Sequence, residues 1–365
     1  MPKYKKFIPV NTPLINNADA SCVAKIIKSG WISSEGPSVK EFENKIAKFL
    51  NRKFGCAVSS GTAALEIAIK SLNLKKNDEV IIPSFTIISN AMAVVKSSAK
   101  PILVDVDLHT WNIKIEDIEK KITKKTKCII GVHLYGQPFD VSSLIDITQD
   151  LGIFLVEDAS QAHGAKYKNQ IVGGFGELAC FSFYPSKNLG TYGEGGGITT
   201  NNKKFKKNIN LLRNHGSDKK YYHDLIGFNM KMGGLESTVL NIKLRYLKKW
   251  NKKRKIIAKK YLEEIKSDKI KKQSHPENTD SVHHLFVIMT NDRKDLIKYL
   301  KREKIHTGIH YPIPCHLQRA FDFLGHKRGD FPASEYLADH CLSLPLYPEM
   351  TDKMVQKVIK EINAY

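Results

Sequence analysis

The chain has 365 residues, of which 42% are hydrophobic and 26% charged, a composition typical of a soluble globular protein with one large and one smaller domain. The six cysteines are scattered without a C-x-x-C pair, the N-terminus lacks the apolar core of a signal peptide, and no apolar stretch is long enough to span a bilayer, so we expect a cytoplasmic protein without a disulfide framework, a cysteine-rich zinc site or a membrane contact. The net charge of +21 comes from lysines spread along the chain, which favours an ordinary charged surface that attracts an anionic substrate over a nucleic-acid groove.

Short apolar runs alternate with helix-like segments over the first two-thirds of the chain. Buried strands are expected at residues 78–83, 101–107, 127–134 and 153–158. Helical spacing is found between them, at residues 62–72, 88–98, 115–122 and 141–152. This alternation predicts an α/β fold with a mostly parallel central sheet and helices on both faces.

The last third of the chain has a different order of elements. A long, strongly basic helix is expected at about 235–265, followed by a strand at 282–290 and by helices at 292–303, near 331–341 and at 351–363. We expect a smaller C-terminal α+β domain here. The predicted boundaries are residues 1–245 for the large domain and 246–365 for the small one.

Two polar features lie where a parallel sheet usually forms its site. Asp158 ends the expected strand 153–158, and the carboxyl ends of such strands line the ligand crevice. Residues 59–62 (SSGT) precede an apolar-faced helix, whose N-terminal amides and dipole favour an anion such as phosphate. A helix cap or surface ion pair at Asp158, and a plain N-cap at 59–62, stay open as alternatives.

Lys187 follows the apolar run CFSFYPS and precedes the glycine-rich GTYGEGGG. Partial burial of a lysine lowers its pKa because desolvation disfavours the ammonium, and a neutral amine can form a Schiff base. A lysine that extends from a strand edge into solvent remains the alternative. A phosphate cradle, an acidic strand end and a buried lysine are together the requirements of pyridoxal phosphate (PLP): the lysine holds the aldehyde, and the carboxylate keeps the pyridine nitrogen protonated.

In-order motifs over nearly the whole chain carry a family resemblance. They are SGWISSEGPSVKEFE (29–43), SSGTAALE (59–66), VIIPSFT (80–86), VHLYGQP (132–138), VEDASQAHGA (156–165), FSFYPSKNLG (181–190), RNHGS (213–217), TGIHYPIPCHLQ (307–318) and LSLPLYPEMT (342–351). The chain resembles the nucleotide-sugar aminotransferases of the DegT/StrS type. The resemblance implies PLP as cofactor, the aspartate-aminotransferase fold (fold type I of PLP-dependent transferases) and a homodimer with shared active sites.

The resemblance also implies roles for single residues. Lys187 would bind the cofactor aldehyde and shuttle the proton, Asp158 would pair with the pyridine nitrogen, and Gln161 would hydrogen-bond the ring hydroxyl. Gly61, Thr62 and Ser182 would bind the cofactor phosphate, and Asn229 would reach that phosphate from the other subunit.

The chain departs from the family pattern at two places. The family often has an aromatic residue that stacks on the cofactor ring where this chain has Ile87, so we expect Phe85 to take that role. The family often has an arginine and an acid where this chain has Lys231 and Gly233. Lysine is a point charge without the bidentate fork of arginine, which weakens the expected contact with a substrate diphosphate.

The same motifs suggest a substrate. By resemblance we expect L-glutamate as amino donor and a dTDP-linked 3-keto-6-deoxyhexose as acceptor; amination at C4 and a UDP-linked sugar are the first alternatives. Candidate substrate contacts are Tyr184, Lys231, His310, Tyr311 and His316. A purely structural role is equally open for both histidines, and we expect no metal site. A sugar dehydratase, whose relatives replace the lysine by histidine, and a non-catalytic basic binding protein are less favoured because Lys187, the acid and the cradle are all present.

Overall fold

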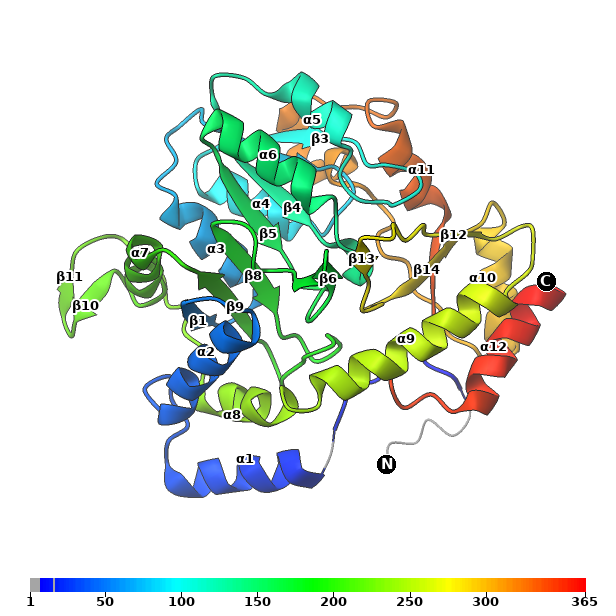
Figure 1. Cartoon of the computed structure of the whole chain (residues 1–365), viewed down its shortest axis with the longest axis horizontal. Helices are drawn as coiled ribbons and strands as arrows, with labels where there is room; N and C mark the ends of the chain where they lie inside the picture. The colour runs from blue at the N-terminus through cyan, green and yellow to red at the C-terminus, as the bar shows by residue number, and fades with distance from the viewer. Residues whose placement is uncertain (1–6, 16) are drawn as a thin grey trace.

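A computed structural model of the chain describes residues 7–15 and 17–365. In this part of the chain, the main sheet has seven strands in the order β1-β9-β8-β5-β4-β2-β3 (Figure 1). Their bounds are β1 Phe54–Val58, β2 Glu79–Pro83, β3 Lys100–Val104, β4 Thr126–Val132, β5 Phe154–Asp158, β8 Leu178–Ser182 and β9 Gly196–Thr200. Strands β8, β5, β4, β2 and β3 are parallel, and β9 is antiparallel to both β1 and β8. The predicted mostly parallel sheet is therefore confirmed.

Alternating side chains of the strands supply two separate cores, one on each face of the sheet. In β4, Cys128 and Ile130 belong to one core and Ile129 to the other, as the two-residue period of a strand requires. The first face is covered by α3 (Gly61–Ser71), α4 (Ser89–Lys96) and α7 (Lys203–Arg213). The second face is covered by α2 (Pro37–Phe49), α5 (Ile115–Lys121), α6 (Val141–Leu151) and α8 (Gly234–Lys243).

The single helix predicted over residues 235–265 is wrong in one respect. The structure has two helices, α8 and α9 (Leu247–Glu264), with a break at residues 244–246. The break follows from packing, since α8 lies against α1 (Asn17–Ser29) and α2, whereas α9 runs away from them to α12 (Asp352–Ala364) (Figure 1). The sequence of this stretch is basic on its solvent side and contains no signal that predicts the break.

The C-terminal part builds a small sheet and a third core. Its strands are β12 (Lys271–Lys272), β14 (Phe286–Met289) and β15 (Cys341–Leu344), and its helices include α10 (Arg293–Arg302), α11 (Pro332–His340) and α12. Short strands elsewhere are β6 (Lys166–Tyr167), β7 (Gln170–Ile171) and β13 (Thr279–Asp280) in one sheet, and β10 (Ser217–Lys219) with β11 (Tyr222–His223) in a hairpin. Apolar residues of α9, α10, α12, β14 and β15 form the third core.

A carboxylate of the large sheet holds a helix of the C-terminal part. Asp105 follows β3, and its Oδ1 accepts hydrogen bonds from the backbone N–H of Ser334, at 2.8 Å, and from the Ser334 hydroxyl, at 2.6 Å. Its Oδ2 accepts the N–H of Ala333 at 2.9 Å. These groups belong to the first turn of α11, whose free amides a carboxylate stabilises.

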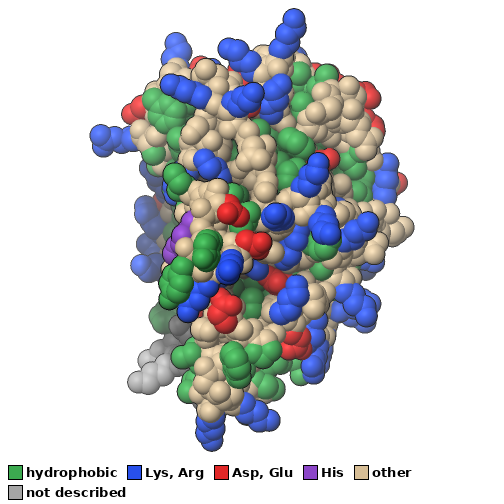
Figure 2. All heavy atoms as spheres, turned by 90° about the vertical axis from the view of Figure 1, so that its left-hand side faces the viewer, with side chains coloured by type: hydrophobic (Ala, Val, Ile, Leu, Met, Phe, Trp, Pro, Cys, Tyr) green, Lys and Arg blue, Asp and Glu red, His purple; other side chains and the backbone are tan. Residues whose placement is uncertain are grey.

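Side-chain charge is dispersed over the face of the molecule that Figure 2 shows. Figure 2 shows the side of the molecule that carries α7 and the β10–β11 hairpin, with lysines and arginines scattered among acidic and apolar side chains.

Within residues 7–15 and 17–365, none of the helices has the length and apolar character needed to cross a membrane. All six cysteines are free thiols.

Candidate active site

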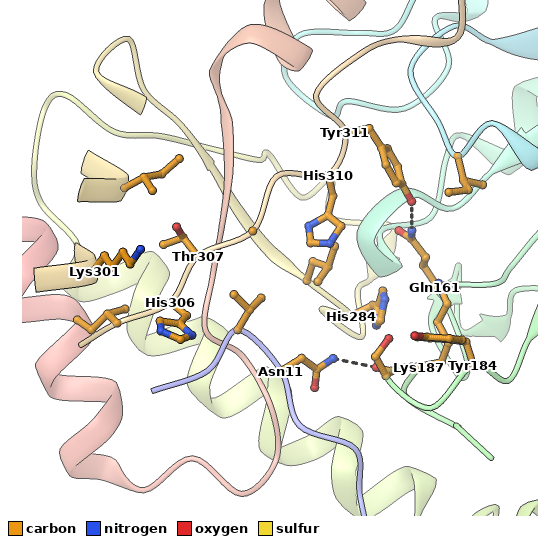
Figure 3. Close-up of a pocket in the computed structure, with 17 residues that line it drawn as sticks. Asn11, Gln161, Tyr184, Lys187, His284, Lys301, His306, Thr307, His310 and Tyr311 are labelled. Atoms are coloured by element: carbon orange, nitrogen blue, oxygen red, sulfur yellow. Dashed lines mark hydrogen bonds between the residues drawn. The ribbon is translucent and has the colours of Figure 1, made fainter. Parts of the chain in front are cut away.

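Two cavities meet at Lys187, at the carboxyl ends of the parallel strands. The smaller has a volume of about 280 Å³, and the larger, drawn in Figure 3, has about 860 Å³. Both are lined by the same five residues where they join: Ile87, Gln161, Tyr184, Lys187 and Tyr311. The smaller cavity lies over β5, β8 and α3, and the C-terminal part closes the larger one.

The loop after β8 brings Lys187 into this junction. Fully buried Phe181 and Phe183 anchor the end of the strand, and the Lys187 N–H donates to the Tyr184 carbonyl at 2.9 Å. Gly190 is required behind it, because an added Cβ would lie 2.6 Å from a backbone carbonyl oxygen of the same loop. Burial lowers the pKa of Lys187 to about 8, although the charge of Asp158 acts to raise it.

Asp158 is held as an acceptor at the floor of the smaller cavity. It is buried at the end of β5. Its Oδ2 accepts the Asn90 Nδ2–H at 2.9 Å and its Oδ1 accepts the Ser160 N–H at 3.1 Å. Both partners only donate, which matches an ionised carboxylate. The neighbouring Glu157 points to the opposite face, as strand alternation requires.

Glu157 anchors the strand from that second face. Its carboxylate accepts the backbone N–H groups of Gly173, Phe175 and Gly176 and lies 3.1 Å from His133 Nε2. Burial would raise the pKa of Glu157, but these hydrogen bonds and His133 outweigh it and lower the pKa. Strand β5 is thereby fixed next to the residue that faces the cavity.

The N-terminus of α3 forms an anion cradle at the other end of the smaller cavity. Ser60 caps the helix by accepting the Ala63 N–H at 3.0 Å, which leaves the first amides, those of Gly61 and Thr62, directed beyond the helix end. Gly61 packs so closely on β8 that an added Cβ would lie 2.5 Å from the Ser182 Cβ. Five residues of this cradle line the cavity together: Ser60, Gly61, Thr62, Ser89 and Ser182.

Gln161 and Tyr311 form a hydrogen-bonded wall between the cavities. Gln161 Oε1 accepts the Tyr135 N–H at 2.6 Å, and its Nε2 donates to the Tyr311 hydroxyl at 2.9 Å. One N–H of the Gln161 amide remains for a ligand. Burial raises the pKa of Tyr311 well above its ordinary value, with the charge of Asp158 acting in the same direction, so its hydroxyl stays protonated.

His310 and Tyr184 complete the walls beside Lys187. His310 Nδ1 lies 2.8 Å from the Ser343 hydroxyl, and burial and then the charge of Lys187 lower the His310 pKa. Tyr184 is 48% exposed and lines both cavities. The structure thus brings together nine of the predicted site residues: Gly61, Thr62, Asp158, Gln161, Ser182, Tyr184, Lys187, His310 and Tyr311. Ile87, where the chain departs from the family pattern, lines both cavities with them.

Four predicted residues are not brought to either cavity. Phe85 is buried in the core and touches the cavity wall only edge-on, through Tyr311 at a ring distance of 6.3 Å; Ile87 lies at the wall in its place. His316 is buried against Glu335, with Nε2 and Oε1 2.9 Å apart. Lys231 pairs with Glu35 at 3.0 Å, and Asn229 lies beside Asn214, so neither reaches the cavities of its own chain.

The smaller cavity fits PLP. Unused amides of Gly61 and Thr62 and the Ser182 hydroxyl suit its phosphate, the buried carboxylate of Asp158 suits a protonated pyridine nitrogen, and the Lys187 amine suits its aldehyde. Within the described ranges, histidines, cysteines and carboxylates are nowhere grouped in threes that could hold a metal ion.

Asn90 and His284 are among the residues of this site that sequence reasoning missed. Asn90, which donates a hydrogen bond to Asp158, lies on α4 among apolar neighbours and is fully buried. A polar amide among the apolar residues of this helix could have indicated a buried hydrogen-bonding role. His284, which lines the larger cavity, lies two residues before the strand β14 in the C-terminal part. Its only signal was a histidine at the edge of an apolar run.

The lowered pKa of Lys187 predicts the pH dependence of cofactor capture. Only the neutral amine attacks the aldehyde, so the rate constant for PLP binding to apoenzyme should rise with pH and level off above about 8. Stopped-flow absorbance measures it. The reaction of PLP with Nα-acetyl-lysine, whose amine titrates near about 10.4, is the reference that removes the titration of PLP itself. A rate that climbs in parallel with this reference up to pH 10 would contradict the burial of Lys187.

The His316–Glu335 pair predicts a stability effect without an effect on chemistry. Glu335→Ala leaves the His316 ring and the Gly329 N–H, which lies 2.8 Å from Oε1, without their acceptor. We expect the free energy of unfolding in urea to fall by about 1–3 kcal/mol. Glu335→Gln, which keeps one oxygen, should lose less. The kcat of folded Glu335→Ala should match that of the wild type. A tenfold lower kcat at unchanged stability would instead indicate that His316 contributes to substrate binding.

Comparisons with known proteins agree with this geometry. The sequence profile of the DegT/DnrJ/EryC1/StrS aminotransferase family matches residues 13–363. The chain is 40% identical to dTDP-3-amino-3,6-dideoxy-alpha-D-galactopyranose transaminase from Aneurinibacillus thermoaerophilus, over 93% of each chain. The structure of S. venezuelae DesV in complex with a ketimine intermediate superposes with a TM-score of 0.92 at 34% identity, over 95% of this chain and 94% of that one. That of NtdA from Bacillus subtilis with bound cofactor PMP gives 0.87 at 29% identity, over 95% and 82%.

Proposed function

This chain belongs to the DegT/DnrJ/EryC1/StrS aminotransferase family, and we propose that it transfers an amino group from L-glutamate to C3 of a dTDP-linked 3-keto-6-deoxyhexose. The protein is a PLP-dependent nucleotide-sugar aminotransferase. The observation that carries the proposal is the position of the Lys187 amine, where a cavity that fits PLP opens into a larger one that has room for a sugar. The relative from Aneurinibacillus thermoaerophilus supports the choice of sugar.

The site residues divide the work of the reaction. When bound, PLP supplies an electron sink that stabilises negative charge on the substrate carbon. Lys187 would move a proton between two carbons in each half: from the amino-bearing carbon of glutamate to the carbon that was the cofactor's aldehyde, and in the sugar half in the opposite direction, from that cofactor carbon to C3 of the sugar. A pKa of about 8 suits this role near neutral pH. Asp158 keeps the pyridine nitrogen protonated, because an ionised carboxylate favours the adjacent cation.

Other residues hold and orient the cofactor and the sugar. Gly61, Thr62 and Ser182 bind the phosphate, and the remaining N–H of Gln161 binds the ring hydroxyl. Tyr184, His310 and Tyr311 line the space for the sugar. Ile87 covers the ring, a role that we expected of an aromatic residue. We also propose that residues 1–245 form a cofactor-binding domain and residues 246–365 a smaller C-terminal domain. Residues of both parts line the larger cavity.

We further propose a homodimer in the cytoplasm. Asn229 and Lys231 lie outside the cavities of their own chain, which suits residues that serve a partner's phosphate and substrate. Large apolar side chains are exposed nearby: Trp31, Ile32, Tyr221 and Ile226 are 54%, 51%, 81% and 93% exposed. A second copy would cover them. Free thiols at all six cysteines suit a reducing compartment.

Absorbance spectroscopy followed by product analysis tests this function. Protein reconstituted with PLP should show a visible Schiff-base band, and L-glutamate should convert it to the pyridoxamine form. That form should then aminate a dTDP-linked 3-keto-6-deoxyhexose to the 3-amino-3,6-dideoxyhexose, with the new amine placed by NMR. Amination at C4, or turnover of a UDP-linked sugar instead, would replace the proposed substrate. The absence of the band would overturn the role of Lys187.

A further inference from the structure

His284 lies in the larger cavity with a rigidly held backbone. It precedes β14, its side chain is buried with 4% exposure, and it lines the cavity together with Lys187 (Figure 3). Its N–H donates to the Tyr135 carbonyl at 2.8 Å, and its carbonyl accepts from Arg254 Nη1 at 3.1 Å. The ring position is therefore set by the fold, independently of any ligand.

A chain of amides fixes which ring nitrogen of His284 carries the proton. Asn251 Nδ2 donates to the His163 carbonyl at 2.7 Å, so Asn251 Oδ1 is the acceptor for Asn188 Nδ2 at 3.0 Å. Asn188 Nδ2 also donates to the Val282 carbonyl at 3.2 Å. Carbonyl oxygens only accept, so both amide orientations are determined. Asn188 Oδ1 must then accept, and His284 Nδ1, 3.1 Å away, must donate.

The second nitrogen of the ring is consequently an acceptor. Burial, and then the charges of Lys187 and Arg254, lower the pKa of His284 well below its ordinary value, so the ring is neutral. A neutral imidazole protonated on Nδ1 has a lone pair on Nε2. Within residues 7–15 and 17–365 no donor is found for this Nε2, and the ring borders the cavity.

A lone pair at this place selects among the ligands of the enzyme. Carboxylates of an amino-acid donor are ionised near neutral pH and only accept hydrogen bonds, whereas a sugar hydroxyl donates. Lys187 must reach the carbon that gains or loses the proton, so a group that shares its cavity wall faces substituents on the neighbouring carbons. A buried acceptor left empty costs binding, which is how a site rejects an analogue that lacks one hydroxyl.

We propose that His284 Nε2 accepts a hydrogen bond from the hydroxyl at C4, one of the two carbons next to C3, and so makes the enzyme selective for 4-hydroxylated over 4-deoxy sugars. The inference rests on the proposed amination at C3. His284 affects the rate of the sugar half of the reaction. It does not affect the rate of the glutamate half, because glutamate has no hydroxyl group that could donate to it.

Two substitutions separate the two ring nitrogens. His284→Asn keeps an N–H near the Nδ1 position for Asn188 and removes the Nε2 acceptor, whereas His284→Gln places an amide oxygen or nitrogen near the Nε2 position. His283→Asn is the matched control, since His283 is the adjacent histidine, lies outside both cavities and stacks edge-on with His275. Thermal unfolding and the PLP band identify the variants that fold and bind cofactor.

The assay runs the sugar half-reaction backwards in a single turnover. Enzyme in its PLP form is mixed with dTDP-3-amino-3,6-dideoxygalactose or with the 4-deoxy sugar dTDP-3-amino-3,4,6-trideoxyglucose, and conversion to the pyridoxamine form is followed by absorbance. We expect His284→Asn to react about 10- to 100-fold more slowly with the 4-hydroxylated sugar. Its rates with the 4-deoxy sugar and with glutamate should stay within about threefold of wild type, and His284→Gln should recover part of the loss.

The outcomes distinguish this inference from the proposed function. Equal losses with both sugars, a matching loss with glutamate, or no loss at all would overturn the assignment of His284 while leaving the aminotransferase reaction in place. The same loss in His283→Asn would also overturn it, because the effect would then come from the strand. If the wild type reacts with glutamate but with neither sugar, the proposed substrate falls and this inference falls with it.

Discussion

Lys187→Ala is expected to lower kcat by at least about 10³-fold, the largest effect of any single substitution in this chain. In the proposed reaction, alanine would remove both the amine that binds the aldehyde and the base that moves the proton at the substrate carbon. No other lysine lines the smaller cavity within the described ranges, so nothing replaces it. The variant should keep its fold, because the Lys187 loop is held by backbone hydrogen bonds and by buried Phe181 and Phe183.

Turnover with glutamate and the keto sugar, together with the visible spectrum of the PLP-loaded variant, measures this loss. Lys243 supplies the matched control. It is also buried, burial also lowers its pKa to about 8, and its Nζ donates to the Gly190 carbonyl at 3.0 Å, away from both cavities. Lys243→Met should therefore keep the band and the turnover. An active Lys187→Ala variant would show that another group binds the aldehyde.

Asp158→Asn is expected to lower kcat by about 10²–10³-fold, the scale on which preorganised electrostatic groups contribute. In the proposed site, the amide would remove the negative charge that keeps the pyridine nitrogen protonated, so the ring would withdraw electrons less well. Asn90 Nδ2, which now donates to Asp158 at 2.9 Å, keeps an oxygen acceptor after the substitution. The loss of charge also removes the influence that raises the Lys187 pKa, so that pKa should fall below about 8.

Single-turnover reaction with glutamate isolates this effect from sugar binding, and the retained PLP band shows that the cofactor is still held. Glu157→Gln is the control on the same strand. Glu157 is a buried carboxylate with backbone N–H partners on the opposite face of the sheet, so its substitution should lower stability and leave the half-reaction rate of folded protein unchanged. A half-reaction in Asp158→Asn as fast as in wild type would separate Asp158 from the pyridine nitrogen.

The parts of the fold that sequence predicted have local causes. Strands β2 to β5 are short apolar runs buried on both faces, and the helices between them carry their own apolar spacing. Strand β9 was missed because its first residues are glycines, which disfavour strands. Their reason is tertiary: a Cβ on Gly196 would lie 2.1 Å from the Ser60 carbonyl oxygen. Such a close approach exists only after α3 and β9 have met.

The site shows the same division between local and distant causes. Lys187, Asp158 and Gly61 each stand in a segment whose own pattern marks them. His310 and His316 look alike in sequence, yet one lines the cavity and the other is buried against Glu335, and only the packing of α11 decides between them. Phe85 and Ile87 are two residues apart at the end of β2, where the turn of the chain determines which side chain faces the cavity.

The hydrogen bonds between Asp105 and the first turn of α11 limit how this enzyme can be recombined with its relatives. Asp105 and Ser334 are 229 residues apart in sequence, so a chimaera with one crossover anywhere between them takes the carboxylate from one parent and the helix start from the other. Such a chimaera keeps these hydrogen bonds only if both parents have the carboxylate and the matching helix start. Exchange of a C-terminal block to alter sugar preference should therefore carry residue 105 with it, or should place both crossovers between residue 105 and α11.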